Sequence, residues 1–459
     1  MIPVLTPAEM AEVDRTAPEP VDELVRRAAG ALARTVVDLL GGTYGRRVVV
    51  VAGPGNNGND GRVAAALLER RGVRCTVVDA AAAPDLLPPC DLVVDAAYGT
   101  GFRGDYRFPD PDGAPVLAVD VPSGVSGLTG AVGGRPAHAV ATVTFAALKP
   151  GLLLGAGPAF AGLVEVADIG LDVSGATVHL VEDADVVAWV PDRAADAHKW
   201  RHAVAVVAGS PGMTGAAALA ATAAFRAGAG YVRLTVPGAA GPTPGVPLEV
   251  VERPAAVGDH AAVLADLSRC AALVVGPGLG RSDGARDLVR ALLAGAGLPL
   301  VLDGDGLRLL GGRPAEVLSA RTAPTVLTPH DAEFESLAGA PPGDDRLAAV
   351  RDLAVRTGCT VLLKGPTTVV ADPDGAALLV RAGDQRLATA GTGDVLSGTV
   401  AALLALGAPP LRAAAAGAHL HGTAARLGPV RGLVASDVAA LLPAAWAHLV
   451  GPGGTDAHA

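Results

Sequence analysis

The sequence predicts an α/β protein with two doubly wound α/β domains, and three observations support this prediction. Short β-branched runs alternate with alanine-rich helical stretches almost throughout the chain. The alternation restarts after the polar stretch 192–198, which is the best candidate for a linker. The 459 residues, half of them apolar, exceed the ~150 residues typical of one domain. We therefore expect a front domain over 1–188, a rear domain over 189–450 and a flexible tail over 451–459.

The composition argues against several classes of function. A net charge of −10 disfavours sequence-independent nucleic-acid binding, which depends on neutralising phosphates with Lys and Arg. No basic and apolar leader opens the chain, and apolar stretches such as 400–408 are far too short to span a membrane. The four cysteines form no C-x-x-C pair, which fits a reduced, cytoplasmic compartment. We expect no nucleic acid and no membrane among the partners.

Lysine is rare in this chain. Arginine supplies nearly all of the 36 Lys and Arg residues, and the lysines are Lys149, Lys199 and Lys364. Where Arg fills most positive positions, a Lys can mark a site that needs a compact ammonium group. The alternative is chance survival on the surface.

In the front half, β-branched runs predict buried parallel strands. The predicted strands are 48–51, 76–78, 92–94, 116–119 and 142–145. Between the first two, residues 60–71 predict a helix. This order of strand, helix and strand is typical of a doubly wound sheet.

Polar side chains follow three of these strands. The first strand leads into the glycine-rich segment Gly53–Gly61, where a helix N-terminus can hold an anion and Asn57 supplies an oxygen. The other two strands end in Asp95 and Asp120, and Ser123 follows the second. Because ligands bind beyond the carboxyl ends of parallel strands, we expect these side chains around one crevice, where oxygen ligands suit a hard cation. Each aspartate taken singly could instead cap a helix.

Four segments of the front half resemble the NAD(P)H-hydrate epimerase domain, over about residues 1–180. They are Gly53–Gly61, Asp95–Gly104, Asp120–Gly124 and Phe145–Gly151. That family interconverts the R and S hydrates at C6 of the reduced nicotinamide ring and uses potassium. The resemblance implies a Rossmann-like fold, with Asp120 as the acid/base group and Lys149 as the lysine of the family's F-x-x-x-K segment.

The same resemblance implies the ligands of this domain. The implied potassium ligands are Asn57, Asp95 and Ser123. The implied substrate pocket contains Asn56, Asn57, Gly58, Asn59, Asp60, Gly99, Thr100, Gly101, Phe102, Arg103, Gly104, Asp105 and Asp120. The family usually has Gly where Asn59 stands, which leaves open whether the domain is fully active.

In the rear half a second series of runs predicts strands at 204–207, 232–236, 273–275, 300–302, 325–327 and 361–363. Helical stretches lie between them at 215–227, 285–293 and 347–357. Further along, Gly391-Thr392-Gly393-Asp394 predicts a helix start whose backbone N–H groups form an anion site. Taken alone, this motif could be an ordinary capped helix.

The rear half, over about 190–450, resembles the ribokinase-like, nucleotide-dependent NAD(P)H-hydrate dehydratases. The matching segments, in order, are His198–Trp200, Gly209–Ala217, Phe225–Val232, Gly276–Gly280, Asp303–Leu307, Thr328–His330, Lys364–Gly365 and Gly391–Asp394. The resemblance implies that Asp394 takes the substrate's hydroxyl proton during phosphorylation while the glycine loop holds the phosphate charge. It implies substrate contacts from Ala216, Gly278, His330 and Asp394. It implies nucleotide contacts from Lys364, Gly365, Pro366, Thr367, Thr368 and Gly393.

Together the two resemblances imply an enzyme that repairs nicotinamide nucleotides, both isomerase and lyase. The expected small-molecule partners are NAD(P)H hydrate and ADP, and ADP would give AMP and phosphate. The expected ions are K⁺ in the front domain and Mg²⁺ with ADP in the rear domain. We also expect a homo-oligomer. One alternative is a small-molecule kinase, because ribokinase-like folds also phosphorylate vitamins. Another is a non-catalytic front domain, as in a eukaryotic mRNA-decapping scaffold protein.

Overall fold

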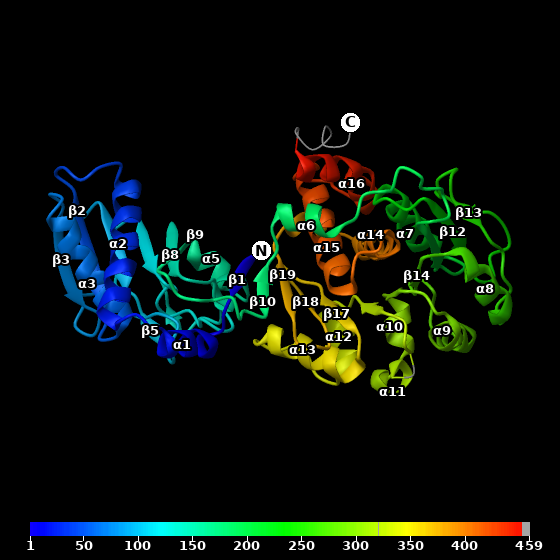
Figure 1. Cartoon of the computed structure of the whole chain (residues 1–459), viewed down its shortest axis with the longest axis horizontal. Helices are drawn as coiled ribbons and strands as arrows, with labels where there is room; N and C mark the ends of the chain where they lie inside the picture. The colour runs from blue at the N-terminus through cyan, green and yellow to red at the C-terminus, as the bar shows by residue number, and fades with distance from the viewer. Residues whose placement is uncertain (320, 452–459) are drawn as a thin grey trace. The chain divides into compact units, whose positions relative to one another are not determined.

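The computed structural model describes residues 1–319 and 321–451. The chain divides into two compact units, here called the front unit (Ile2–Val178) and the rear unit, which starts at His179 (Figure 1). The sequence placed this boundary between 188 and 189. Helix α6 (Asp183–Trp189) belongs to the rear unit because Val186 and Trp189 are buried in its core. Of the expected tail, only residue 451 lies within the described residues.

The front unit is built on one parallel sheet, which confirms the doubly wound prediction for this half. In spatial order its strands are β3 (Arg74–Asp79), β2 (Arg47–Ala52), β4 (Leu92–Ala96), β6 (Val116–Val119), β8 (Ala141–Phe145) and β9 (Leu163–Ala167). Its helices are α1 (Pro7–Thr16), α2 (Val21–Leu40), α3 (Asn56–Glu69), α4 (Pro150–Leu153) and α5 (Gly157–Ala161). Short strands complete the unit at β1 (Ile2–Val4), β5 (Tyr106–Arg107) and β7 (Gly134–Arg135).

Both faces of this sheet are buried. Successive residues of a strand point to opposite faces, so each strand contributes to two cores. In β2, Val48 and Val50 join the core that α2 and α3 cover, whereas Val49 and Val51 join a smaller core on the other face. A strand buried on both faces needs an unbroken apolar run, and this is why the runs in the sequence predicted β2, β4, β6 and β8 well.

Two predictions for the front unit were wrong. Residues 76–78 were expected to be buried, yet β3 is an edge strand with exposed and half-buried positions, and Val77 is 46% exposed. An edge strand has a neighbour on one side only, and the apolar run does not reveal this. The helix expected from residue 60 starts at Asn56, so residues 56–60 form the start of α3.

The rear unit has a larger sheet with the order β10-β19-β18-β17-β16-β15-β14-β11-β12-β13. Neighbouring strands from β13 to β17 run parallel, and β18 and β19 follow as an antiparallel hairpin. The strands are β10 (Val178–Leu180), β11 (Ala203–Val207), β12 (Tyr231–Thr235), β13 (Val251–Glu252), β14 (Ala272–Val275), β15 (Leu300–Leu302), β16 (Thr325–Leu327), β17 (Thr360–Leu363), β18 (Thr368–Ala371) and β19 (Ala377–Val380). All six strands predicted for this half are present.

Helices cover this sheet. They are α7 (Thr214–Arg226), α8 (His260–Asp266), α9 (Asp283–Gly295), α10 (Asp305–Leu309), α11 (Pro314–Leu318), α12 (Asp331–Ala338), α13 (Arg346–Thr357), α14 (Thr392–Leu406), α15 (Pro410–Leu427) and α16 (Ala435–Val450), with single 3₁₀ turns at 267–269 and 385–387. Small residues let α14 approach α7 closely: a Cβ at Gly398 would lie 2.1 Å from the Ala220 carbonyl oxygen. In the part of the chain that the structure describes, no helix is both long and apolar enough to cross a bilayer.

Candidate active sites

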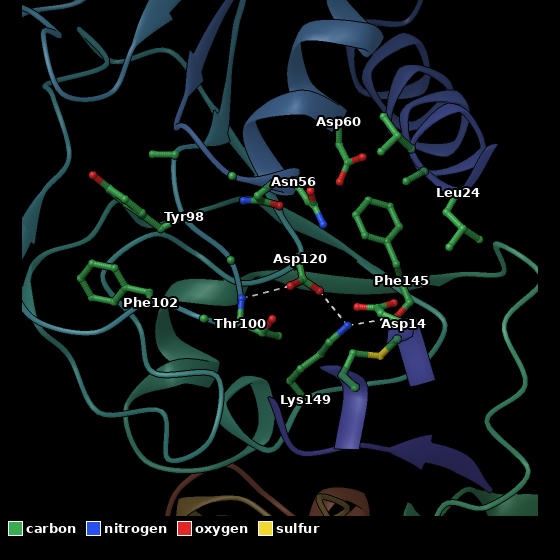
Figure 2. Close-up of a pocket in the computed structure, with 18 of the residues that line it drawn as sticks. Asp14, Leu24, Asn56, Asp60, Tyr98, Thr100, Phe102, Asp120, Phe145 and Lys149 are labelled. Atoms are coloured by element: carbon green, nitrogen blue, oxygen red, sulfur yellow. Dashed lines mark hydrogen bonds and ion pairs between the residues drawn. The ribbon is translucent and has the colours of Figure 1, made fainter. Parts of the chain in front are cut away.

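The front unit contains a cavity of about 670 Å³ at the carboxyl ends of β2, β4 and β6 (Figure 2). This volume lies within the ~300–1,000 Å³ typical of sites for small ligands. The predicted substrate residues that line it are Asn56, Asn57, Asp60, Gly99, Thr100, Gly101, Phe102, Arg103, Asp105 and Asp120. Gly58, Asn59 and Gly104 do not contribute to the lining. Gly58 instead packs on the preceding loop, where a Cβ would lie 2.0 Å from the Gly53 carbonyl oxygen.

Asp120 follows β6 and is held by a buried cation. Its backbone is left-handed (φ +67°), a conformation that Asp tolerates better than most residues. Lys149, whose side chain is 2% exposed, places its Nζ 2.7 Å from the Asp120 carboxylate. Thr144 Oγ1 donates to the same carboxylate at 3.0 Å and the Thr100 backbone N–H at 3.2 Å. Lys149 also donates to Thr144 Oγ1 and to the Phe145 carbonyl, so the pair is fixed from several sides.

Asp60 faces the same cavity in a different electrostatic state. It is only 7% exposed, and its carboxyl group has no hydrogen bond or ion pair with any residue in the described ranges. Burial, with smaller contributions from the charges of Asp120 and Asp14, raises the pKa of Asp60 to about 8. With a pKa of about 8 the Asp60 carboxyl is mostly protonated at neutral pH, whereas the Asp120 carboxylate that lines the same cavity is paired with Lys149.

Asp95 and Ser123, predicted to share one site, are in contact. Ser123 donates to the Asp95 carboxylate through its backbone N–H at 2.8 Å and its Oγ at 2.5 Å. Asp95 is 1% exposed, and burial raises its pKa to about 6 against these hydrogen bonds. Within residues 1–319 and 321–451, no cationic side chain pairs with Asp95. A buried carboxylate that lacks a cation is the kind of group that a bound metal ion can balance.

The loop after β4 connects this pair to the rest of the cavity. The Tyr98 backbone N–H donates to Ser123 Oγ at 2.8 Å. At Gly99 a Cβ would lie 3.0 Å from an Asp120 oxygen and 3.3 Å from Asn57 Cγ, so a larger residue would push against both side chains. The Asn57 side-chain nitrogen is buried and finds no hydrogen-bond partner in the described part of the chain. The loop after β4 therefore lies next to Ser123, Asp120 and Asn57, three of the residues predicted to surround the crevice.

The rear site centres on the first turn of α14. Gly391 is the N-cap with φ +90°, and Thr392, Gly393 and Asp394 are the first helical residues, so their backbone N–H groups have no partner within the helix. Burial, with a smaller contribution from the charge of Asp303, raises the pKa of Asp394 to about 7 against the opposing effect of Lys364. The structure therefore places a helix start and a carboxyl group side by side, as the sequence predicted, and such a helix start is able to hold an anion.

A second lysine–aspartate pair lies against this turn. Lys364 Nζ is 2.7 Å from the carboxylate of Asp303, which is 2% exposed and accepts a hydrogen bond from Ser397 Oγ at 2.5 Å. A Cβ at Gly393 would lie 3.2 Å from Lys364 Nζ, so the structure brings these two predicted residues together. Asp303 and Ser397 are not among the site residues predicted from the sequence. Asp303 carried a usable signal, because it directly follows a predicted strand as Asp95 and Asp120 do.

The other predicted rear residues lie on neighbouring loops. Gly278 is left-handed (φ +59°), and a Cβ there would lie 2.9 Å from Ala216 Cβ, so these two predicted substrate residues are adjacent. His330 is the N-cap of α12, and its Nδ1 accepts hydrogen bonds from the first turn of that helix. Residues Gly365, Pro366 and Thr367 form the turn between β17 and β18, and Thr368 opens β18.

Each of the two α/β units has carboxyl groups at one edge of its sheet, and the rear unit also has a helix start that is able to hold an anion. These features define an enzyme with two sites for small ligands. Residues 204–442 match the family described as NAD(P)H-hydrate dehydratase. Residues 21–88 and 76–151 match the family described as YjeF-related protein N-terminus. The chain belongs to the family of bifunctional NAD(P)H-hydrate repair enzymes.

Relatives and solved structures support this assignment. The chain is 38% identical to the bifunctional NAD(P)H-hydrate repair enzyme Nnr of Salinibacter ruber, over 98% of this chain and 97% of that one. It is 42% identical to the Mycobacterium tuberculosis enzyme of the same name, over 88% and 89% of the two chains. The rear unit resembles a solved ADP/ATP-dependent NAD(P)H-hydrate dehydratase from Bacillus subtilis that was co-crystallised with ATP/Mg²⁺. That match has a TM-score of 0.53 and 29% identity, and it covers 59% of this chain and 98% of that one.

Proposed function

We propose that this chain repairs hydrated nicotinamide nucleotides at two sites. The front unit interconverts the R and S hydrates at C6, and the rear unit dehydrates the S hydrate with ADP, giving NAD(P)H, AMP and phosphate. The observation that carries the proposal is the first turn of α14, where the Asp394 carboxyl lies beside backbone N–H groups that have no partner within the helix.

In the rear unit Asp394 acts as the base. Its pKa of about 7 lets the carboxylate accept the proton of the C6 hydroxyl as that oxygen attacks the terminal phosphorus of ADP and AMP departs. The backbone N–H groups of Gly391–Gly393 stabilise the negative charge of the transferred phosphoryl group. Loss of phosphate from C6 and of a proton from C5 then restores the double bond of NAD(P)H. Ala216, Gly278 and His330 contact the hydrate, and Lys364–Thr368 with Gly393 contact the nucleotide.

Mg²⁺ fits this site as the companion of the nucleotide. It is usually held by phosphates and water with one or two carboxylates. Asp394 and Glu333 are carboxyl groups beside Lys364, and neither makes an ion pair with a Lys or Arg among the residues that the structure describes, so they would supply those ligands. When bound, Mg²⁺ neutralises phosphate charge.

In the front unit Asp120 moves protons at C6 while Lys149 balances its charge. Potassium fits beside it because Asp95 is a buried carboxylate with no cationic partner in residues 1–319 and 321–451. Asn57, Asp95 and Ser123 would hold the ion. When bound, K⁺ supplies positive charge next to the loop that contacts Asp120.

One assay tests both activities. Purified R and S hydrates are incubated with ADP or ATP, with and without K⁺, and both NADH absorbance and the epimer ratio are followed. We expect the S hydrate to yield NADH with ADP, and the R hydrate to do so only while the front unit is active. A stable phosphorylated product without NADH would identify a kinase instead. Failure to convert the R hydrate would identify a non-catalytic front unit. Light scattering of the same sample tests the proposed homo-oligomer.

A further inference from the structure

Asp60 has no structural task that explains its position. It is the fifth residue of α3, past the positions at which an acidic side chain caps a helix, and its carboxyl group lacks a partner in the described residues. The α2 side chains that line the cavity are all apolar: Val21, Leu24, Val25 and Ala28. Burying a carboxyl group without a hydrogen bond costs stability, so the folded chain gains nothing from an Asp here.

The geometry points to Asp60 as a second catalytic residue of the front site, the proton donor that works together with Asp120 in epimerisation. This inference rests on the proposed epimerase function and adds a residue and a chemical step to it. Figure 2 shows the Asp60 carboxyl extending into the cavity from α3 and the Asp120 carboxyl entering it from the end of β6. A ligand in the cavity is therefore within reach of both groups.

The two carboxyl groups are prepared for opposite roles. Asp120 has Lys149 at 2.7 Å and hydrogen bonds from Thr144 and Thr100, so its negative charge is balanced. Asp60 has none of these, and the charged groups that face it are the carboxylates of Asp120 and Asp14. An acid and a base held in one cavity by different surroundings are what a reaction needs when one proton is given and another taken.

The step balances with these two groups and one water. C6 of the hydrate carries a hydroxyl group and is bonded to the ring nitrogen. Asp60 donates its proton to that hydroxyl, the C6–O bond breaks, water departs, and the nitrogen lone pair forms a C6=N⁺ bond. A second water then adds to the other face of C6, Asp120 takes its extra proton, and the C=N electron pair returns to nitrogen. The product has the opposite configuration, and the reverse reaction exchanges the two roles.

The test is Asp60→Asn in the full-length chain. Asparagine keeps the size and hydrogen-bonding capacity of the side chain but cannot transfer a proton. We expect kcat for R-to-S conversion, measured without ADP by separating the epimers, to fall about 10²-fold or more. The KM for the hydrate and the K⁺ concentration for half-maximal rate should stay within about twofold, because binding groups are retained. The retained KM and K⁺ dependence show that the front unit is folded, and dehydration of the S hydrate should be unchanged because that site lies in the rear unit.

Asp38→Asn is the matched control, because Asp38 is an exposed carboxylate on α2 in the same unit and outside the cavity lining. It should epimerise like the wild type. A wild-type kcat in Asp60→Asn, or a higher KM with kcat retained, would overturn the inference. Epimerisation in ¹⁸O-labelled water should label the C6 hydroxyl, and a product that keeps its original oxygen would also overturn it. A wild-type chain with no epimerase activity would instead refute the proposed function itself.

Discussion

The Lys149–Asp120 ion pair should stabilise the front unit only while both partners are present. Lys149 is 2% exposed, and its ammonium contacts Asp120, Thr144 and the Phe145 carbonyl. Lys149→Met removes the cation and leaves a buried carboxylate, whereas Asp120→Asn leaves a buried ammonium group. In both single variants the remaining charge has lost its partner but keeps its desolvation cost.

The magnitude follows from burial. Removing one partner of a buried ion pair typically costs about 3 to 5 kcal/mol. Thr144 stays in contact with either survivor, so we expect the lower end of this range, about 3 kcal/mol, for each single variant. The double variant Lys149→Met/Asp120→Asn leaves no unpaired charge. Its cost should therefore be smaller than the sum of the single costs by about 1 to 3 kcal/mol.

Hydrogen exchange of the full-length chain is the suitable assay, because it reports each unit separately. Protection of peptides from β6 and β8 gives the free energy of opening for the front unit. All three tryptophans, Trp189, Trp200 and Trp446, lie in the rear unit, so their fluorescence serves as a control that should not change. If the double variant loses the full sum of the single losses, the charges are not coupled and the reasoning about this pair is refuted.

Three further predictions concern the rear unit. Asp394→Asn should abolish NADH formation from the S hydrate and spare epimerisation; retained NADH formation would exclude Asp394 as the base. Dehydration by the wild type should rise with pH through about 7, because the base must be ionised, and Asp303→Asn should move this midpoint to lower pH in a pH–rate profile. A midpoint that moves upward would contradict the repulsion between Asp303 and Asp394. Gly398→Ala would place a Cβ 2.1 Å from the Ala220 carbonyl oxygen and should destabilise the rear unit by about 1 to 3 kcal/mol. Thermal unfolding followed by tryptophan fluorescence checks it, and an unchanged midpoint would mean that the two helices separate easily.

The sequence predicted the central strands well because strands buried on both faces are continuous apolar runs. It missed β18 and β19, although the turn between them, Asp372-Pro373-Asp374-Gly375, is a typical hairpin signal and Gly375 adopts φ +93°. It misplaced the start of α3 because Asn and Gly are weak helix formers inside a helix and are tolerated in its first turn. Such boundaries depend on the loop that the helix start must follow, and this is a tertiary property.

For the candidate sites, the rule that ligands bind beyond the carboxyl ends of parallel strands predicted that Asp95 and Asp120 lie at the same edge of the sheet. The same rule applied to the run 300–302 would have identified Asp303. The protonation of Asp60 had no such signal. It depends on burial of the carboxyl group in a cavity that residues of α1 and α2 and the residue after β6 line together. It also depends on the charge of Asp120, which is distant in the sequence.

Both units hold a buried lysine–aspartate pair, and this explains why a second carboxyl group next to each pair is available for proton transfer. Of the three lysines, Lys149 pairs with Asp120 and Lys364 with Asp303, each Asp directly following a parallel strand. In each unit a second carboxyl group faces the pair without a cation of its own, Asp60 in front and Asp394 behind, and its pKa is raised to about 8 or about 7. The negative charge of the paired Asp is part of the cause in both cases. A buried lysine–aspartate pair thus leaves its neighbouring carboxyl group able to exchange protons near neutral pH, which general acid–base chemistry requires.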